Sequence, residues 1–533
     1  MKKFASILAC LLAVQPAAAS TTRLLSLGLD NWQLDDETNH WTNPALLRSA
    51  PDFGLFEIGT QNAAGGALTA NSQWGGFHKS LGDSAVFALY VRRPYQTNDF
   101  NAGATPLTTP IIGGNITPQG VNDLPDLDAK SDVAAQWETD GPFGTGGSEL
   151  GITGAPNVNR NIALPQNYAD AVFAWAWGRM DWGLHYNYAR NAGNQVRRVR
   201  YESSTGTDGF MELERLSQEH NMRLGWRWNG FKNSWMHMAM DASMPDFDMD
   251  YQEGRANGAY SRSYIRSEPM VNAGGLFQFG HRNETESMWS VTVRGSVIDT
   301  TAVAQRQDDD GPNGLLEVNK NAYWANTRKF ASVDFTWVRP FDKYRALLIS
   351  SFGAQHIYTK QTFLFTDINT PANNHADMAR STSLLFPLRV AVETSPWDFL
   401  AVRAGLQKNL FSEQRSTFHD GDGTTPAVYR SSDTAVSDPN GTADGVGLSF
   451  GVGIKIVDGL MWDSVVRQLF LFDGPQVVGG RANGFLAQTT LVYRWGEEDA
   501  LKRVTKLKPA FNLKKLFSRR PAYEAGDGVR LSE

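Results

Sequence analysis

Hydrophobic and polar residues alternate with a period of two along much of this chain. In the segment 171–190, one face of the alternation is large and apolar, with Phe173, Trp175, Trp177, Trp182, Leu184, Tyr186 and Tyr188. The other face is small or polar, and the alternation breaks only at Gly178–Asp181. A period of two is typical of a β-strand, and a short break containing Gly and Asp between two such runs predicts a hairpin.

The same pattern recurs from the middle of the chain to its end. Each further segment has one apolar face and one small or polar face; these segments are 221–228, 236–241, 289–297, 332–337, 389–393, 400–407, 446–456 and 490–495. Two architectures fit such strands. In a soluble sandwich the apolar face meets another sheet, whereas in a membrane barrel it meets lipid and the polar face lines the lumen.

Tryptophans beside the short breaks favour the barrel. Trp177 and Trp182 flank one predicted turn, and Trp228 and Trp235 flank the next. Aromatic side chains gather at the two membrane–water interfaces of transmembrane proteins. The apolar faces are therefore expected to meet lipid.

The breaks between strands alternate between short and long. Seven are short, at 81–84, 178–181, 229–233, 280–287, 340–345, 394–399 and 457–459, whereas the longest connection runs from about residue 95 to residue 166. Outer-membrane barrels have short periplasmic turns and long outer loops. We therefore predict an all-β fold, a transmembrane antiparallel up-and-down β-barrel spanning residues 53–495. Seven turns with a further strand at each end give 16 strands, and merged strands would give 14.

The two ends of the chain have their own character. Residues 1–19 resemble a secretory signal peptide, because Lys2 and Lys3 precede an apolar stretch and small residues end it. The only cysteine, Cys10, lies in that stretch, so no thiol chemistry is expected after cleavage. Residues 496–533 form a basic tail, expected to be periplasmic and solvated or to contact an anionic surface or a periplasmic partner.

Composition narrows the function. The chain is 41% hydrophobic, yet it has no apolar stretch long enough for a transmembrane helix after the signal. A net charge of -6 gives no electrostatic reason to expect a nucleic-acid partner. Export with a cleaved signal leaves three destinations: secretion, the periplasm or the outer membrane. Together with the barrel pattern it predicts a location in the outer membrane, in contact with its lipid and lipopolysaccharide.

A short motif precedes the first expected strand. The stretch "LGLDNWQLDDETNHWTNPALL" places acidic residues shortly before Trp41, Asn43, Pro44 and Ala45. This motif ahead of a barrel resembles the long-chain fatty acid transporter family of outer-membrane proteins and the related type 9 secretion shuttle barrels. The resemblance implies a barrel of fourteen strands, an N-terminal hatch (residues 20–52) folded inside it, and a hydrophobic small-molecule ligand. The family's Gly/Ala-rich run before the motif is absent, and the chain continues past Trp495.

The polar faces predict a charged lumen. The lumen-lining charges read from the alternation are Arg223, Arg227, Arg294, Arg389, Arg403, Lys455, Arg494, Asp241, Asp334 and Glu393. An acidic cluster in the hatch, made of Asp30, Asp35, Asp36 and Glu37, is expected to pair with these cations. The alternative is an open porin whose arginine face selects anions.

Catalytic and metal motifs are lacking. The sequence has no His-x-x-x-His, and its Gly-x-Ser-x-Gly at 447–451 lies inside the alternating segment 446–456 and not at a turn, so we expect neither an enzyme nor a metal or other cofactor. The loops 308–314 and 419–423 resemble calcium loops only in composition. We expect a channel or transporter for fatty-acid-like or aromatic compounds; the alternatives are a general or anion-selective porin and a scaffold or secretion-associated barrel that binds proteins.

Overall fold

The computed structural model describes most of the predicted barrel. The described residues are 21–34, 37–59, 73–91, 110–112, 114–115, 166–197, 210–228, 233–254, 260–268, 271–284, 286–308, 317–368, 371, 374–419, 428–435, 446–466 and 486–495. The predicted signal peptide, the basic tail and nearly all of the long connection 95–166 lie outside these residues.

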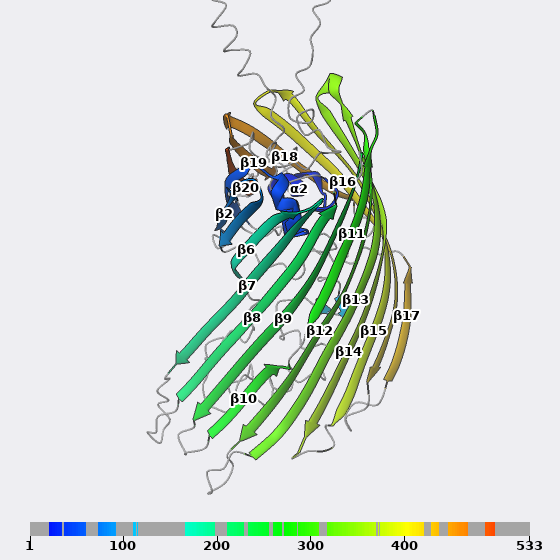
Figure 1. The fold of residues 1–533 in the computed structure, drawn as a ribbon. Coiled ribbons are helices and arrows are strands. Elements are labelled where there is room, and N and C mark those ends of the chain that lie inside the picture. Colours follow the sequence, from blue (N-terminus) through cyan, green and yellow to red (C-terminus); the bar gives the residue numbers. More distant parts are fainter. Residues whose placement is uncertain are drawn as a thin grey trace, which may run out of the picture.

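One closed antiparallel sheet forms the body of the molecule (Figure 1). Its strands are β1 (Asp52–Gly59), β2 (Gln73–Leu81), β3 (Ala85–Val91), β6 (Gln166–Trp177), β7 (Met180–Arg197), β8 (Phe210–Trp228), β9 (Ser234–Gly254), β10 (Tyr260–Ser267), β11 (Asn272–Arg282), β12 (Met288–Asp308), β13 (Glu317–Phe341), β14 (Ala346–Asp367), β15 (His375–Trp397), β16 (Leu400–His419), β17 (Val428–Ala435), β18 (Val446–Val457), β19 (Leu460–Val466) and β20 (Leu486–Trp495). A separate small hairpin joins β4 (Pro110–Ile112) to β5 (Gly114–Asn115).

Closure comes from the pairing of the first and last strands. β1 pairs with β2 on one edge and with β20 on the other. Among the described residues eighteen strands share the sheet, but β10 and β11 both lie between β9 and β12, and β17 and β18 both pair with β16. Eighteen strands minus these two shared positions leave sixteen around the barrel. The predicted fold is confirmed at the upper end of the predicted strand number, two more than the family resemblance implies.

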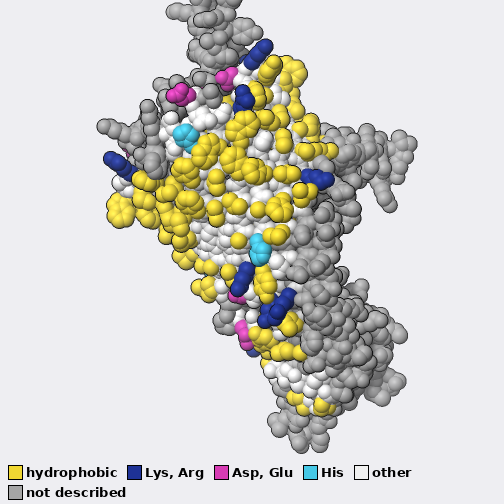
Figure 2. Space-filling view, turned by 90° about the vertical axis from the view of Figure 1, so that its right-hand side faces the viewer, with side chains coloured by type: hydrophobic (Ala, Val, Ile, Leu, Met, Phe, Trp, Pro, Cys, Tyr) yellow, Lys and Arg dark blue, Asp and Glu magenta, His cyan; other side chains and the backbone are white. Residues whose placement is uncertain are grey.

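The two faces of the wall differ as the alternation predicted. Outward side chains such as Met222 and Phe352 are large, apolar and more than half exposed, whereas their neighbours Arg223 and Ser351 are buried. Figure 2 shows hydrophobic side chains spread over the outer surface. An apolar exterior with a polar interior is the arrangement that a barrel needs in lipid.

Short turns gather at one end of the barrel, which we call the short-turn end (the top of Figure 1). β6 and β7 are joined there by Gly178, whose φ of 64° is accessible to glycine at little steric cost. The strands β12 to β16 run for 20–25 residues toward the other end, whereas crossing a bilayer needs about 9–11. The sheet therefore continues beyond the membrane on the long-loop side.

One strand position contains an extra residue. β10 and β11 follow each other along the same neighbours, and the pair Ser267 with Ala302 gives way to Ala273 with Val297. Six residues on this strand then face five on β12, and the count against β9 also differs by one. Such an offset is a bulge that reverses which residues face outward.

Three short helices precede β1 at the short-turn end. They are α2 (Thr21–Leu27), η1 (Glu37–Trp41) and η2 (Pro44–Ser49), and a further short helix, η6 (Asp342–Tyr344), forms the turn between β13 and β14. Across the described residues, none of the helices has the length and apolarity needed to span a membrane.

Candidate functional site: the N-terminal segment and the lumen wall

The N-terminal segment, residues 21–51, contacts strands all around the barrel. α2 lies against β15, β16, β18, β19 and β20, while η2 lies against β3, β6, β7 and β8. Between the two helices, the backbone oxygen of Trp32 accepts a hydrogen bond from Gln278 on β11, and Gln33 donates one to Ser351 on β14. A segment that touches opposite walls lies within the lumen, as the ribbon drawing also shows (Figure 1).

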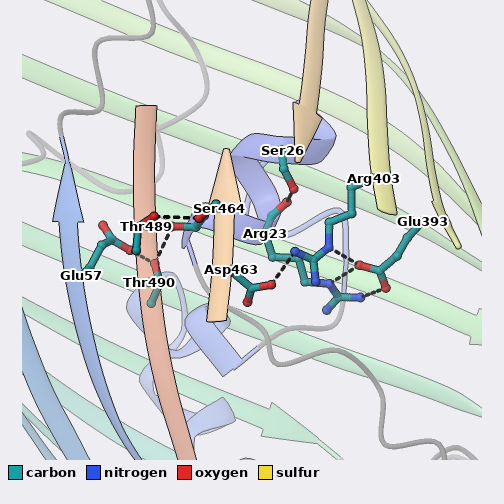
Figure 3. Close-up of polar contacts among 10 residues, drawn as sticks. Arg23, Ser26, Glu57, Glu393, Arg403, Asp463, Ser464, Thr489 and Thr490 are labelled. Carbon is teal, nitrogen blue, oxygen red and sulfur yellow. Dashed lines mark hydrogen bonds and ion pairs between the residues drawn. The ribbon is translucent and has the colours of Figure 1, made fainter. Parts of the chain in front are cut away.

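A chain of alternating charges fixes α2 to the wall (Figure 3). Arg23 on α2 donates to both oxygens of Glu393 at 2.8 Å, and Arg403 donates to Glu393 at 2.7 Å and to Asp463 at 2.5 Å. All four side chains are nearly inaccessible to solvent. Because each buried charge faces an opposite one, the desolvation cost is offset by charge-assisted hydrogen bonds.

The backbone of α2 approaches the wall where the wall has glycine. A Cβ atom added to Gly405 would lie 2.0 Å from the Leu27 carbonyl oxygen, and one added to Gly451 would lie 2.3 Å from the Ser26 Cβ. Both separations are shorter than any van der Waals contact allows. The lumen-facing glycines of β16 and β18 therefore form a floor on which the end of α2 lies.

Hydroxyl groups on β20 complete this end of the segment (Figure 3). Thr22 and Thr490 share a hydrogen bond, and Thr490 also donates to Glu57 on β1 at 2.7 Å. Because β1 and β20 are the strands that close the barrel, the contact ties α2 to the closing seam.

A second group of contacts fixes η2. Arg48 donates to Asp181 and to the backbone oxygen of Asp83, and Arg227 donates to Asp181 at 2.6 Å. Asp181 is fully buried between these two guanidinium groups. The pattern repeats that of α2: an arginine of the segment and an arginine of the wall share one wall carboxylate.

The motif residues Asn43, Pro44 and Ala45 lie on a second glycine floor. The Asn43 side chain caps η2 by accepting from the Ala45 backbone N–H, and its amide donates to the Trp226 carbonyl oxygen at 3.2 Å. A Cβ added to Gly183 would lie 2.2 Å from the Pro44 carbonyl carbon, and one added to Gly225 would lie 2.1 Å from Asn43 Oδ1. Pro at the first helical position supplies the fixed φ that starts the helix.

The fourth motif residue, Trp41, is the centre of an aromatic cluster. Its ring centroid lies 5.2 Å from that of Trp74 and 5.7 Å from that of Tyr90, and His40 stacks on Tyr90 at 5.4 Å. Trp74 donates to Glu57 at 2.7 Å. Leu47, Val172 and further buried apolar side chains surround these rings, so the lumen carries a large apolar zone at this wall.

The middle of the segment meets the remaining predicted lumen charges. Asp30 accepts from Arg389 at 2.5 Å, and the guanidinium carbon of Arg294 lies 3.8 Å from the Trp32 ring centroid. Arg294 also donates to Asp334 at 2.8 Å. A cation over a tryptophan face is favourable, more so when both groups are desolvated.

Of the other residues expected in the lumen, Arg223 pairs with Asp241 at 3.1 Å and Arg494 is buried on β20. Lys455 is half-buried and pairs with Asp458 in the turn after β18. In the acidic cluster, Asp35 and Asp36 lie outside the described residues; Glu37 starts η1, but its side chain is not among those described.

Sequence analysis did not identify the two basic residues that hold the segment, Arg23 and Arg48. It also missed two wall carboxylates, Asp181, which pairs with Arg48, and Asp463, which pairs with Arg403. It expected acidic groups of the segment to meet a cationic wall, whereas these contacts have the opposite polarity. Asp181 was assigned to a turn, although it holds the first buried position of β7. No periodic signal marks Arg23 or Arg48, because the segment is not a strand.

Solved structures that match the chain are outer-membrane proteins at very low sequence identity. No family model matches the chain, and no curated protein matches it. The toluene transporter TodX of Pseudomonas putida matches in structure at 8% identity over 90% of this chain and 97% of its own, with a TM-score of 0.36. The ferric yersiniabactin uptake receptor FyuA of Yersinia pestis matches at 6% identity over 84% and 80%, with 0.32, and the outer-membrane protease OmpT of Escherichia coli at 8% over 58% and 96%, with 0.21.

These likenesses say nothing of ligand or activity. The pairing of the strands and the apolar outer face make the chain a closed transmembrane antiparallel β-barrel of the outer-membrane type.

Proposed function

We propose that the protein is an outer-membrane channel or transporter for hydrophobic small molecules, in which the N-terminal segment acts as a hatch. The observation that carries the proposal is the fixation of that segment at both of its ends by buried ion pairs and glycine floors. A barrel of sixteen strand positions has a lumen too wide for its own side chains to fill, so a filling segment governs passage through it.

The charge pairing supports a hatch over an anion-selective open pore. Arg223, Arg227, Arg294, Arg389 and Arg403 each have a carboxylate partner within 3.1 Å. A selectivity wall needs cations that face water, because ions are drawn by uncompensated charge. Neutralised arginines instead hold a segment in place.

Apolar zones support a hydrophobic ligand. Besides the cluster around Trp41, the segment's Leu24, Leu27, Leu29 and Leu34 pack with Val338, Ile349 and Ala391 on the opposite wall. Movement of the segment would expose both zones to the lumen, and apolar surface next to a few polar groups is the usual lining of a small-molecule site. The ligand class is expected to be fatty-acid-like or aromatic.

The hatch can be tested by locking it. Thr22 on α2 is hydrogen-bonded to Thr490 on β20, so cysteines at both positions in a Cys10→Ser background are placed to form a disulfide. We expect the oxidised Thr22→Cys/Thr490→Cys protein to block uptake of a medium-chain fatty acid and of a monoaromatic compound by cells. Reduction should restore uptake, and each single-cysteine variant should behave as the parent.

Conductance in planar bilayers gives the complementary measurement. Deletion of residues 21–50 should turn a quiet barrel into a conducting one. If the intact protein already conducts freely and the deletion leaves its conductance unchanged, the segment is not a hatch and the protein is a plain porin. If the barrel does not conduct even without the segment, and the disulfide lock does not affect uptake, a scaffold role is indicated instead.

A further inference from the structure

Three cations lie side by side on the outer surface of the barrel, one on each of three adjacent strands. They are Lys329 on β13, Lys360 on β14 and Arg380 on β15, and we call them the outer cation cluster. Lys360 and Arg380 are directly paired across the β14–β15 ladder, and Lys329 is paired with Tyr358, two residues from Lys360. All three are at least partly exposed and occupy outward positions of the alternation.

This arrangement is unfavourable for the protein alone. Like charges directly opposite each other destabilise a β-sheet. Within the part of the chain that the structure describes, neither Lys360 nor Arg380 nor Lys329 has an acidic side chain within ion-pair distance. A negatively charged group from outside the protein would remove the repulsion.

A neighbouring part of the same outer face, separated from β13 by β12 alone, shows what the protein does when it balances such charges itself. There, outward arginines of β10 form ion pairs with outward aspartates of β9. Arg262 donates to both carboxylate oxygens of Asp250, and Arg266 donates to Asp248 at 3.4 Å. The two sets of cations lie on the same outer face. One set has acidic partners, whereas the other has none among the residues that the structure describes. The contrast points to an external anion at β13–β15.

The position of the cluster identifies the kind of anion. Toward the short-turn end, the outward side chains of β15 are Leu384, Phe386, Leu388, Val390 and Val392, all exposed. Positions 384–392 cover about the length that crosses a bilayer. Arg380 therefore lies just past the apolar band on the long-loop side, at the level of the outer lipid headgroups.

We propose that the outer cation cluster binds the phosphate groups of a phosphorylated lipid of the outer leaflet, such as the lipid A part of lipopolysaccharide. Arg supplies a fork of donors that fits phosphate, and Lys supplies a compact charge beside it. The partly exposed Tyr358 brings a hydroxyl donor between Lys329 and Lys360. The proposal rests on the outer-membrane location but not on the hatch.

Native mass spectrometry of the full chain in an uncharged detergent tests the site. The probes are diphosphoryl lipid A, dephosphorylated lipid A and inorganic phosphate. The parent should bind the phosphorylated lipid, and Lys360→Gln/Arg380→Gln should weaken that binding about 20-fold or more, since each basic group at an anionic lipid surface contributes about fivefold. Adding Lys329→Gln should weaken it about fivefold further.

The matched control is Arg262→Gln/Arg266→Gln, which removes the same charge from the same outer face. It should leave lipid binding unchanged, and both variants should keep the heat-modifiability of a folded barrel. Equal losses in the two variants would overturn the site, because the effect would then be one of net charge. Equal binding of the dephosphorylated lipid would overturn the role of phosphate, and binding of inorganic phosphate as tight as lipid A would overturn the assignment to a lipid. Bilayer conductance of the 21–50 deletion is independent of all these outcomes.

Discussion

The two ends of the N-terminal segment are fixed by the same device in different surroundings. At the first end Arg23 and Arg403 share Glu393, and at the second Arg48 and Arg227 share Asp181; glycines of the wall lie beneath the backbone at both. The second end adds a capped, proline-started helix and the aromatic cluster around Trp41. It also continues directly into β1 at Asp52, whereas α2 is some 25 residues from that strand.

The difference indicates which end can move. The η2 end is tied to the wall both covalently and through aromatic packing, so its release would need the barrel itself to change. The α2 end is held by polar contacts and a few leucines, and nothing among the described residues tethers it covalently except its own chain. We therefore expect opening to begin at α2, with the motif residues as the pivot.

Removal of a wall arginine should have the largest effect. Arg403→Met leaves Asp463 buried without its cation and should cost about 3–5 kcal/mol of unfolding free energy. Arg227→Met should cost less, because Asp181 keeps Arg48. Urea unfolding of each variant in lipid vesicles measures both free energies. Equal costs would mean that Arg48 does not compensate for the loss of Arg227 at Asp181.

Truncation of the apolar contacts separates the ends in a second way. Trp41→Ala removes the centre of the aromatic cluster and should cost about 3 kcal/mol or more, whereas Leu24→Ala at the α2 end should cost about 2 kcal/mol. The same unfolding measurement applies. A larger loss at Leu24 would make α2, and not the motif, the more firmly packed end.

The glycine floors predict a smaller effect that depends on position. Gly183→Ala and Gly405→Ala each place a Cβ against the segment backbone and should cost about 1–3 kcal/mol of unfolding free energy. Gly405→Ala, at the end that we expect to open, should also raise bilayer conductance. Gly447 has only ordinary contacts, at 3.6 Å or more, so Gly447→Ala should change neither quantity. Conductance that rises only for Gly405→Ala would support opening at α2.

Single hydrogen bonds should matter least. Asn43→Ala removes the cap of η2 and should cost about 1 kcal/mol. Thr22→Ala removes one hydroxyl contact with Thr490 and should also cost about 1 kcal/mol. If the η2 end is the pivot, only Thr22→Ala should increase the frequency of opening events in single-channel records, although the two variants are similarly stable.

The wall was predictable from the sequence, whereas the way the segment is held was not. Lipid outside and polar groups inside impose the period of two, so positions such as Arg223 and Val293 could be assigned to faces directly. The segment has no such constraint, and Arg23 finds Glu393 some 370 residues away, a contact that no local pattern carries. The role of the wall glycines could not be predicted either. In the sequence, Gly183 and Gly405 are simply small residues on the polar face; the segment backbone beside them in the structure explains why they must be small.

The pairing of β1 with β20 also sets an order of assembly. Thr22 and Thr490, 468 residues apart, meet at that seam, so the contact forms only after the last strand has been made. Loop-closure entropy delays contacts of such separation. A segment enclosed by a wall that seals last has either to wait inside the unfinished sheet or to enter through an open end. Its contact with the seam is therefore assembled at the final step of folding.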